Sequence, residues 1–170
     1  PQDRILSALW GSLIGDALGV PVEFSSRAQR KADPVTDLRE FGVHHQPRGT
    51  WSDDGALLLC SVDSLVAREF DTQDMGRRFV QWRKDALWSS HGVVFDIGTT
   101  TATALRCIVN GTPAEQAGGQ DIHSNGNGSL MRILPVAVRF AHLPAAELLD
   151  RIHRASSITH GHPRALMACG

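Results

Sequence analysis

The chain carries the stretch Gly49-Thr50-Trp51-Ser52-Asp53-Asp54 just before an apolar run at residues 56–60. A polar turn followed by such a run predicts a buried helix that begins near Ser52. The two adjacent carboxylates repel each other, which favours a bound cation, and hard oxygen donors suit Mg²⁺ or Mn²⁺. Helix capping is the alternative, with Ser52 as N-cap and both acids near the positive end of the helix dipole. Taken alone, the stretch is explained more simply by capping.

Apolar residues recur at intervals of three and four along most of the remaining chain, which predicts an all-α fold with few strands. The first expected helix covers residues 5–18 behind Asp3 as N-cap. Further helices are expected at about 54–68, 73–88, 99–110, 113–119, 129–142 and 144–157, with another beginning at 164. Residues 25–50 are polar and contain several Pro and Gly, so we expect a long loop with at most short elements, lying over a site.

Several residues make local predictions about these helices. Gly11, Gly15 and Gly19 share one side of the first helix, where another helix or a ligand could come close. Residues 112–115 read Thr-Pro-Ala-Glu, which predicts a capping box, and Thr99 or Thr100 is the expected N-cap of its own helix. Pro135 should either kink its helix or delay the start of that helix.

The composition of the 170-residue chain is that of one globular domain, here residues 1–170, with 42% apolar and 21% charged residues. A formal net charge of -1 gives no electrostatic case for nucleic acid or an anionic membrane. No uninterrupted apolar run approaches a membrane span and no targeting segment is recognised, so we expect a cytoplasmic protein that does not interact with a membrane. Cys60, Cys107 and Cys169 are expected to be buried, reduced thiols.

Polar side chains that could act in a site gather in four further places. Residues 124–129 read Ser-Asn-Gly-Asn-Gly-Ser before an apolar helix, which suits a phosphate or, equally, a plain loop. His160 could contact a ligand, whereas His162 is as readily a structural histidine. Asp96 could bind a guanidinium or serve as an acid near a helix start. Glu23 could be a general base or a surface glutamate.

In their types and order, these segments resemble the ADP-ribosylglycohydrolase family, which includes the dinitrogenase reductase-activating glycohydrolases. Residues 11–19, with Pro21 and Glu23, resemble the opening helix of the family and its glutamate. Ser52-Asp53-Asp54 resembles the first metal segment of the family, and residues 96–98, 126–132 and 159–163 resemble three later segments. The resemblance covers essentially the whole chain.

The resemblance implies a compact, orthogonal multi-helix domain with a binuclear Mg²⁺ or Mn²⁺ centre at the base of a cleft for ADP-ribose. It implies that Ser52, Asp53 and Asp54 are metal ligands, and that Glu23 and Asp54 are catalytic. The implied substrate contacts are Asp96, which would meet the arginine guanidinium, and Gly98, Gly126, Asn127, Gly128, Ser129 and His160. The implied reaction is hydrolysis of the N-glycosidic bond of ADP-ribosylated arginine, on a protein, or of a related small conjugate.

Two departures from the family pattern leave other functions open. Ser52 stands where members usually carry threonine, and no Asp-x-Asp, the second metal segment of the family, occurs in this chain. We therefore expect the C-terminal part of the family fold to be lacking, its ligands to come from a further segment or a second chain, and apolar helix faces to be uncovered. The alternatives are a non-catalytic ADP-ribose-binding module with an incomplete metal site and a structural protein with the same fold.

Overall fold

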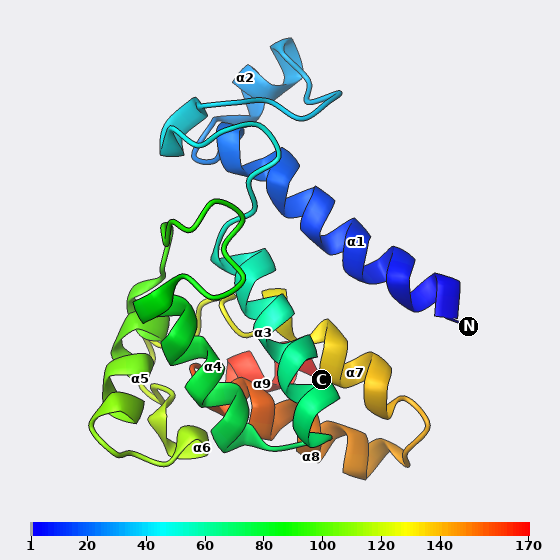
Figure 1. The fold of residues 1–170 in the computed structure, drawn as a ribbon, viewed down its shortest axis with the longest axis vertical. Helices are drawn as coiled ribbons and strands as arrows, with labels where there is room; N and C mark the ends of the chain where they lie inside the picture. The colour runs from blue at the N-terminus through cyan, green and yellow to red at the C-terminus, as the bar shows by residue number, and fades with distance from the viewer. Residues whose placement is uncertain (1) are drawn as a thin grey trace.

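The computed structural model describes residues 2–170, whose only regular secondary structure is helical, since they contain two isolated bridges but no strand. Figure 1 shows a body of packed helices with one long helix, at the N-terminus, running along one side of it. The α-helices are α1 (Gln2–Gly19), α2 (Arg27–Ala32), α3 (Asp53–Arg68), α4 (Thr72–Asp85), α5 (Thr99–Val109), α6 (Ala114–Ala117), α7 (Leu134–Phe140), α8 (Ala145–Ser157) and α9 (Pro163–Cys169). Three short 3₁₀ turns are η1 (Val20–Val22), η2 (Gly42–His44) and η3 (Leu130–Arg132). The all-α prediction is confirmed.

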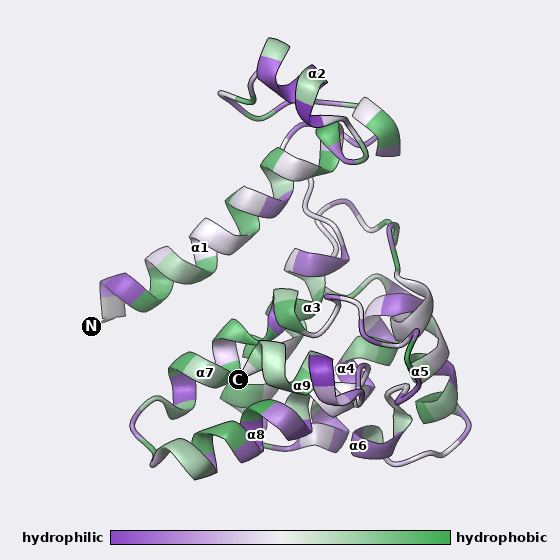
Figure 2. Cartoon of the chain, turned by 180° about the vertical axis from the view of Figure 1, so that it is seen from behind, coloured by the Kyte–Doolittle hydropathy of each residue, from purple (hydrophilic) through white to green (hydrophobic). Residues whose placement is uncertain are grey.

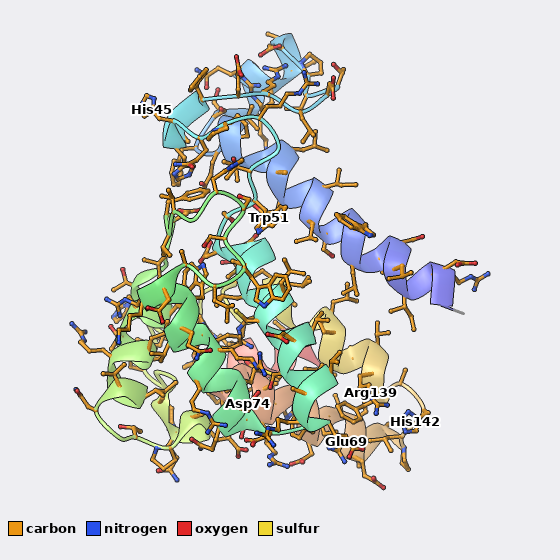
Figure 3. All side chains as sticks on the ribbon, viewed as in Figure 1. His45, Trp51, Glu69, Asp74, Arg139 and His142 are labelled. Carbon is orange, nitrogen blue, oxygen red and sulfur yellow. The ribbon has the colours of Figure 1, made fainter. Side chains whose placement is uncertain are left out.

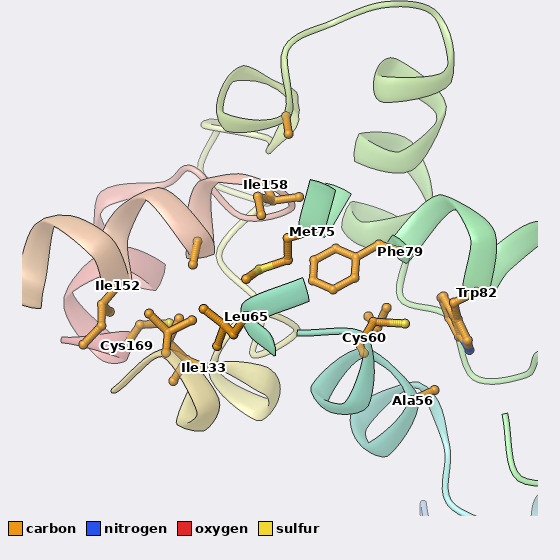
Figure 4. Close-up of a cluster of buried hydrophobic side chains, with 14 of the residues drawn as sticks. Ala56, Cys60, Leu65, Met75, Phe79, Trp82, Ile133, Ile152, Ile158 and Cys169 are labelled. Atoms are coloured by element: carbon orange, nitrogen blue, oxygen red, sulfur yellow. The ribbon is translucent and has the colours of Figure 1, made fainter. Parts of the chain in front are cut away.

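The hydrophobic core lies between α3 and α4 and is closed by α7, α8 and α9. Figure 4 shows Met75 and Phe79 of α4 beside Cys60 of α3 and Ile158, which follows α8. All four side chains are fully buried. Burying apolar side chains of this size contributes roughly 1.5–3 kcal/mol each. The core therefore fixes the direction of α3, whose first turn carries the acidic pair.

Charged residues also join α3 to α4. Asp74, labelled in Figure 3, accepts a hydrogen bond from Ser64 Oγ of α3 at 2.8 Å and one from Arg78 Nε at 2.7 Å. Arg78 also pairs with Asp63 of α3. Burial opposes the shift, but the hydrogen bonds that Asp74 accepts from Arg78, Ser64 and Arg77 favour its carboxylate and lower its pKa. The two helices that organise the core are thus linked on their polar side as well.

Helix α1 packs much less tightly than the rest. Leu6, Trp10 and Ile14 are 56%, 59% and 50% exposed, and Figure 2 shows hydrophobic segments along the free length of the helix. The expected uncovered apolar helix face is therefore present. Among the described residues, Asp3–Val22 has the length and composition of a membrane span, which by itself is weak evidence. This segment contains no long uninterrupted apolar run, because charged residues and glycines interrupt it.

The helix boundaries follow the sequence pattern more closely than the caps do. Ser52 is the N-cap of α3, as expected, and accepts a hydrogen bond from Asp54 N. Pro135 delays its helix, since it lies in the first turn of α7 after a separate 3₁₀ turn. Residues 25–50 form a loop with only α2 and η2 as short elements, as expected.

Three predicted caps are wrong. Asp3 lies inside α1, which already begins at Gln2. Gly98 is the N-cap of α5, so neither threonine after it serves. The expected capping box at 112–115 does not form, because Glu115 instead accepts hydrogen bonds from Thr72 and Arg154. Hydrogen bonds from distant helices thus occupy a side chain that the local pattern assigns to a cap.

Candidate functional site

A cavity of about 790 Å³ lies where α1, the start of α3, the segment before α5 and the turn before η3 converge. Most of the residues singled out in the sequence meet there. The predicted residues that line it are Glu23, Ser52, Asp53, Asp54, Asp96, Gly98, Gly126, Asn127, Gly128 and His160. Gly15 and Gly19 also line it and face open space, so α1 is close to a cavity at this side and no helix packs against it there.

The first turn of α3 is held against α1 by Asp16, a residue that the sequence gives no reason to select. The Asp16 carboxylate accepts hydrogen bonds from Ser52 N, Ser52 Oγ and Gly55 N at 2.9, 2.9 and 2.8 Å. Gly55 is required here, because a Cβ at this position would lie 2.8 Å from Leu13 of α1. Asp16 therefore orients the Ser52 hydroxyl and fixes the end of the acidic segment.

Asp53 is buried and Asp54 is half-buried, and the pKa values of both are strongly perturbed. Burial, followed by repulsion from Asp54, Asp96 and Asp16, raises the pKa of Asp53 to about 8. Burial and repulsion from Asp16, Asp96 and Glu23 raise the pKa of Asp54 to about 6. Neither side chain accepts a hydrogen bond from another described residue. Helix capping therefore accounts for Ser52, but it does not account for two carboxylates turned into a cavity without a partner.

These residues fit a hard divalent cation. The Ser52 hydroxyl donates to Asp16 and accepts a long bond from Asp54 N, which leaves an oxygen lone pair free. The carboxylates of Asp53 and Asp54 offer oxygen ligands whose mutual repulsion a bound cation would relieve. Ser52, Asp53 and Asp54 could thus hold a cation from one side of the cavity.

A second acidic group includes a histidine that sequence reasoning missed. Nε2 of His44, in the loop before α3, lies 2.5 Å from Glu23 Oε2 and 3.9 Å from Asp96 Oδ2. Ligand atoms of Glu23, His44 and Asp96 all lie within 4.8 Å of one another. The ring also contacts Phe95, with centroids 5.2 Å apart. Glu23 is therefore hydrogen-bonded to a flat nitrogen ring, and the Asp96 carboxylate lies nearby.

The backbone around this group adopts conformations that residues other than glycine rarely take. Phe24, Phe41, His45 and Asp96 have φ values of 59°, 63°, 53° and 58°. Such residues persist only where the surrounding structure fixes them, and they gather at functional sites. They lie next to Glu23, on both sides of His44, and at the start of the segment that leads into α5. The surrounding structure therefore fixes the backbone that carries Glu23, His44 and Asp96.

The opposite wall of the cavity is the turn at 126–128 with His160. Gly128 lies so close to the imidazole that a Cβ would stand 2.7 Å from His160 Cε1 and 3.1 Å from Thr101 Oγ1. Gly126 leaves more room, because a Cβ at that position would stand 3.8 Å from His160 Nε2. The glycine at 128 thus permits close packing of the turn on the ring.

Gly128→Ala should lower the free energy of unfolding by about 1–3 kcal/mol, because the added methyl group overpacks a ring that cannot move away. Gly126→Ala is the matched control and should change it by less than about 0.5 kcal/mol, because its methyl group makes an ordinary contact. Denaturant unfolding of both variants measures the difference. Equal stability of the two variants would contradict the packing described for His160.

Two predicted residues of this region need correction or assignment. Ser129 does not line the cavity, because its side chain is buried and its hydroxyl is hydrogen-bonded to that of Ser156, with the two oxygens 2.8 Å apart. The sequence predicts that the turn presents Ser129 to a ligand, but the packing of α8 draws it into the core. His162 is structural, since its Nδ1 accepts from Arg164 N as the N-cap of α9.

The three cysteines are free, and Cys60 and Cys169 are buried, whereas Cys107 is half-buried.

The whole chain matches known proteins of one family. The sequence model of the ADP-ribosylglycohydrolase family matches residues 1–170. The chain is 33% identical to ADP-ribosylarginine hydrolase Tri1 of Pseudomonas putida (strain GB-1) over 98% of its length and 44% of that protein. It is 30% identical to the ADP-ribosyl-[dinitrogen reductase] glycohydrolase of Rhodospirillum rubrum, over 99% of this chain and 55% of that protein.

A solved structure gives the same result for the fold. A chain of an ADP-ribosylglycohydrolase-related protein complex superposes with a TM-score of 0.82 and 34% identity, over 99% of this chain and 53% of that one. The chain thus spans about half the length of the curated relatives it matches.

Proposed function

The chain belongs to the ADP-ribosylglycohydrolase family, and we propose on that basis that it acts as a metal-dependent hydrolase of ADP-ribosyl conjugates. The proposed substrate is ADP-ribosylated arginine, on a protein or as a small molecule, and the bond cleaved is the N-glycosidic bond between ribose and the guanidinium. Two of the relatives carry names for this kind of substrate. The proposed cofactor is Mg²⁺ or Mn²⁺.

The observation that carries the proposal is the division of the cavity into two walls of different chemistry. One wall is acidic and includes Asp53, Asp54 and the Glu23–Asp96 pair. The other wall is the glycine turn at 126–128 with His160. A conjugate that joins an anionic diphosphate to a cationic guanidinium has matching ends, because backbone N–H groups of such a turn bind phosphate oxygens and carboxylates bind a guanidinium.

The residues of the acidic wall have distinct proposed roles. Ser52, Asp53 and Asp54 would hold the cation, which when bound supplies charge for orienting the ribose and activating water. Glu23 would position the attacking water and accept its proton. Positive charge that develops on the ribose ring as the bond breaks would be stabilised by the surrounding carboxylates. Asp96, paired with Glu23 around His44, would hold the guanidinium of the leaving arginine.

The proposal is tested by incubating the complete protein with an ADP-ribosylarginine peptide and measuring free ADP-ribose. Release that needs Mg²⁺ or Mn²⁺ and stops when EDTA is added is the expected result. Release that is unaffected by EDTA, or no release with either metal, would contradict the proposed activity.

Asp96→Ala should reduce turnover of arginine-linked substrate by at least about tenfold, because one hydrogen-bonded charge pair is worth about 1.5–3 kcal/mol. Binding of free ADP-ribose, which has no guanidinium, should change by less than about threefold. Calorimetry with ADP-ribose and a peptide hydrolysis assay measure the two effects. Asp85→Ala, at the exposed end of α4, is the control. Equal losses in both assays would remove the proposed role of Asp96.

A non-catalytic ADP-ribose-binding module is the second candidate. It is favoured by the turn at 126–128 and His160, which line the cavity without belonging to the acidic segment. Such a module would bind ADP-ribose equally well with and without EDTA and would release none from a conjugate. The same two assays therefore separate the two candidates.

A further inference from the structure

A buried arginine stands directly behind the histidine wall of the cavity. Arg132 of η3 is 1% exposed, and its guanidinium lies over the Phe79 ring at 4.5 Å. Its Nη2 donates to Thr159 Oγ1 at 2.8 Å and to the carbonyl oxygen of Ala155 at 3.2 Å. Among the described residues, Nε and Nη1 have no hydrogen-bond partner and no carboxylate forms a salt bridge with this arginine. A buried, unpaired charge costs stability, so packing alone does not explain an arginine here.

The arginine reaches the cavity through one hydroxyl group. Thr159 Oγ1 lies 2.8 Å from Arg132 Nη2 and 2.9 Å from His160 Nδ1. A guanidinium can only donate, so the hydroxyl oxygen accepts from Arg132. Among the described contacts, the proton of the hydroxyl then has His160 Nδ1 as its only acceptor. A neutral imidazole whose Nδ1 accepts a hydrogen bond carries its own proton on Nε2.

The surroundings of His160 also fix its charge and the position of its backbone. Burial, followed by the positive charge of Arg132, lowers the pKa of His160 to about 4, so the imidazole is neutral at pH 7. The backbone of His160 is fixed because its N–H donates to Ser156 O at 2.9 Å and its carbonyl oxygen accepts from Ser156 Oγ at 3.1 Å. His160 lines the cavity beside the turn at 126–128. The imidazole is therefore neutral and its backbone is fixed, and the hydrogen bond between Thr159 Oγ1 and Nδ1 is the contact that bears on its tautomer.

We propose that Arg132 and Thr159 are positioning residues that hold His160 in the tautomer with its proton on Nε2, so that it presents a fixed hydrogen-bond donor to an oxygen of the ligand. The ligand oxygen would belong to the ADP-ribose moiety, and this part rests on the proposed function. The tautomer itself does not, because it follows from contacts within the protein. A preorganised donor binds an acceptor without the cost of reorienting the ring.

Long-range ¹⁵N–¹H correlation spectra of the complete protein, which distinguish the two tautomers of histidine, test the first part. The expected spectrum shows the proton of His160 on Nε2. Thr159→Ser keeps the hydroxyl and should leave this signal unchanged, whereas the near-isosteric Thr159→Val removes the donor to Nδ1 and should yield a mixture of tautomers. A proton on Nδ1 in the unaltered protein, or a signal unchanged in Thr159→Val while that variant keeps its helical circular dichroism, would overturn the proposal.

The same proteins test the link to the ligand and to Arg132. Calorimetry with ADP-ribose should show about tenfold weaker binding for Thr159→Val and less than about threefold for Thr159→Ser. Arg132→Met should raise the pH at which His160 becomes protonated in an NMR titration, because the nearby positive charge is gone. Equal affinity of both Thr159 variants for ADP-ribose, or an unchanged pH of half-protonation of His160 in Arg132→Met, would contradict the proposed positioning of His160 by Arg132 and Thr159. Failure of the unaltered protein to bind ADP-ribose, with the Nε2 tautomer present, would instead contradict only the proposed function.

Discussion

Asp53→Asn and Asp54→Asn should each lower the hydrolysis of ADP-ribosylarginine by about a thousandfold or more, while the helical fold is retained. Asparagine keeps the size of the side chain and removes the negative charge, and loss of a cation from the site removes several kcal/mol of transition-state stabilisation. Both carboxylates face the cavity and do not belong to the apolar core. Replacing either one by asparagine therefore leaves the apolar core intact.

The rate of ADP-ribose release, measured for each variant at saturating Mg²⁺ or Mn²⁺, tests this expectation. Asp85→Asn is the matched control, because this exposed aspartate at the end of α4 lies outside the cavity. It should retain full activity. Circular dichroism of all three variants checks the fold. Turnover within about tenfold of the unaltered protein in either site variant would refute the assignment of that aspartate as a metal ligand.

The second large effect concerns stability and pH when divalent cations are removed. Burial raises the pKa of Asp53 from 3.8 in the unfolded chain to about 8 in the folded protein, and that of Asp54 to about 6. The folded state thus holds these protons more tightly than the unfolded state does. The contribution of these bound protons to the free energy of unfolding is fully present below about pH 4 and is lost as the pH rises to about 8. Since one pKa unit corresponds to about 1.4 kcal/mol, the loss should amount to several kcal/mol.

Denaturant unfolding in EDTA between pH 5 and pH 8 measures this dependence. Carboxylates with lowered pKa values, such as Asp74 and Glu115, act in the opposite direction only below this window. His160, whose pKa is lowered from 6.5 to about 4, acts in the opposite direction below about pH 6.5, so the loss is clearest between pH 6.5 and pH 8. Asp53→Asn should be more stable than the unaltered protein at pH 8, and its stability should vary less with pH. Mn²⁺ should restore stability at pH 8 in the unaltered protein and much less in the variant. Identical pH profiles for both proteins would show that Asp53 is not an uncompensated buried acid.

Local sequence patterns predict the helices and the position of the acidic pair well. The apolar run after Ser52 defines α3, and the spacing at 144–157 defines α8, because each pattern depends on one face of one helix. What no local pattern contains is a partner far along the chain. Asp16 binds the start of α3 from 36 residues away. His44 lies in a polar loop without periodicity, and reaches Glu23 only because η2 of that loop packs on η1.

The same reason explains the residues for which the sequence predicts the wrong role. Glu115 fits a capping box by spacing, but Arg154 of α8 offers a charged partner that the local sequence does not show. Ser129 looks like part of a ligand-binding turn, but Ser156 draws its hydroxyl inward. Arg132 belongs in the sequence only to the segment 126–132, and its contact with Thr159 becomes visible when η3 and the segment after α8 are brought together. Tertiary contacts thus decide the roles of polar residues, whereas periodicity decides where helices form.

Anomalous diffraction from crystals of the complete protein grown with Mn²⁺ and ADP-ribose tests most directly whether the cavity is a metal-dependent ADP-ribose site. We expect an anomalous peak at coordination distance from carboxylate oxygens of Asp53 and Asp54, with ADP-ribose between that ion and His160. Both carboxylates turned into solvent with no ion beside them, although ADP-ribose or Mn²⁺ is present in excess, would contradict this account.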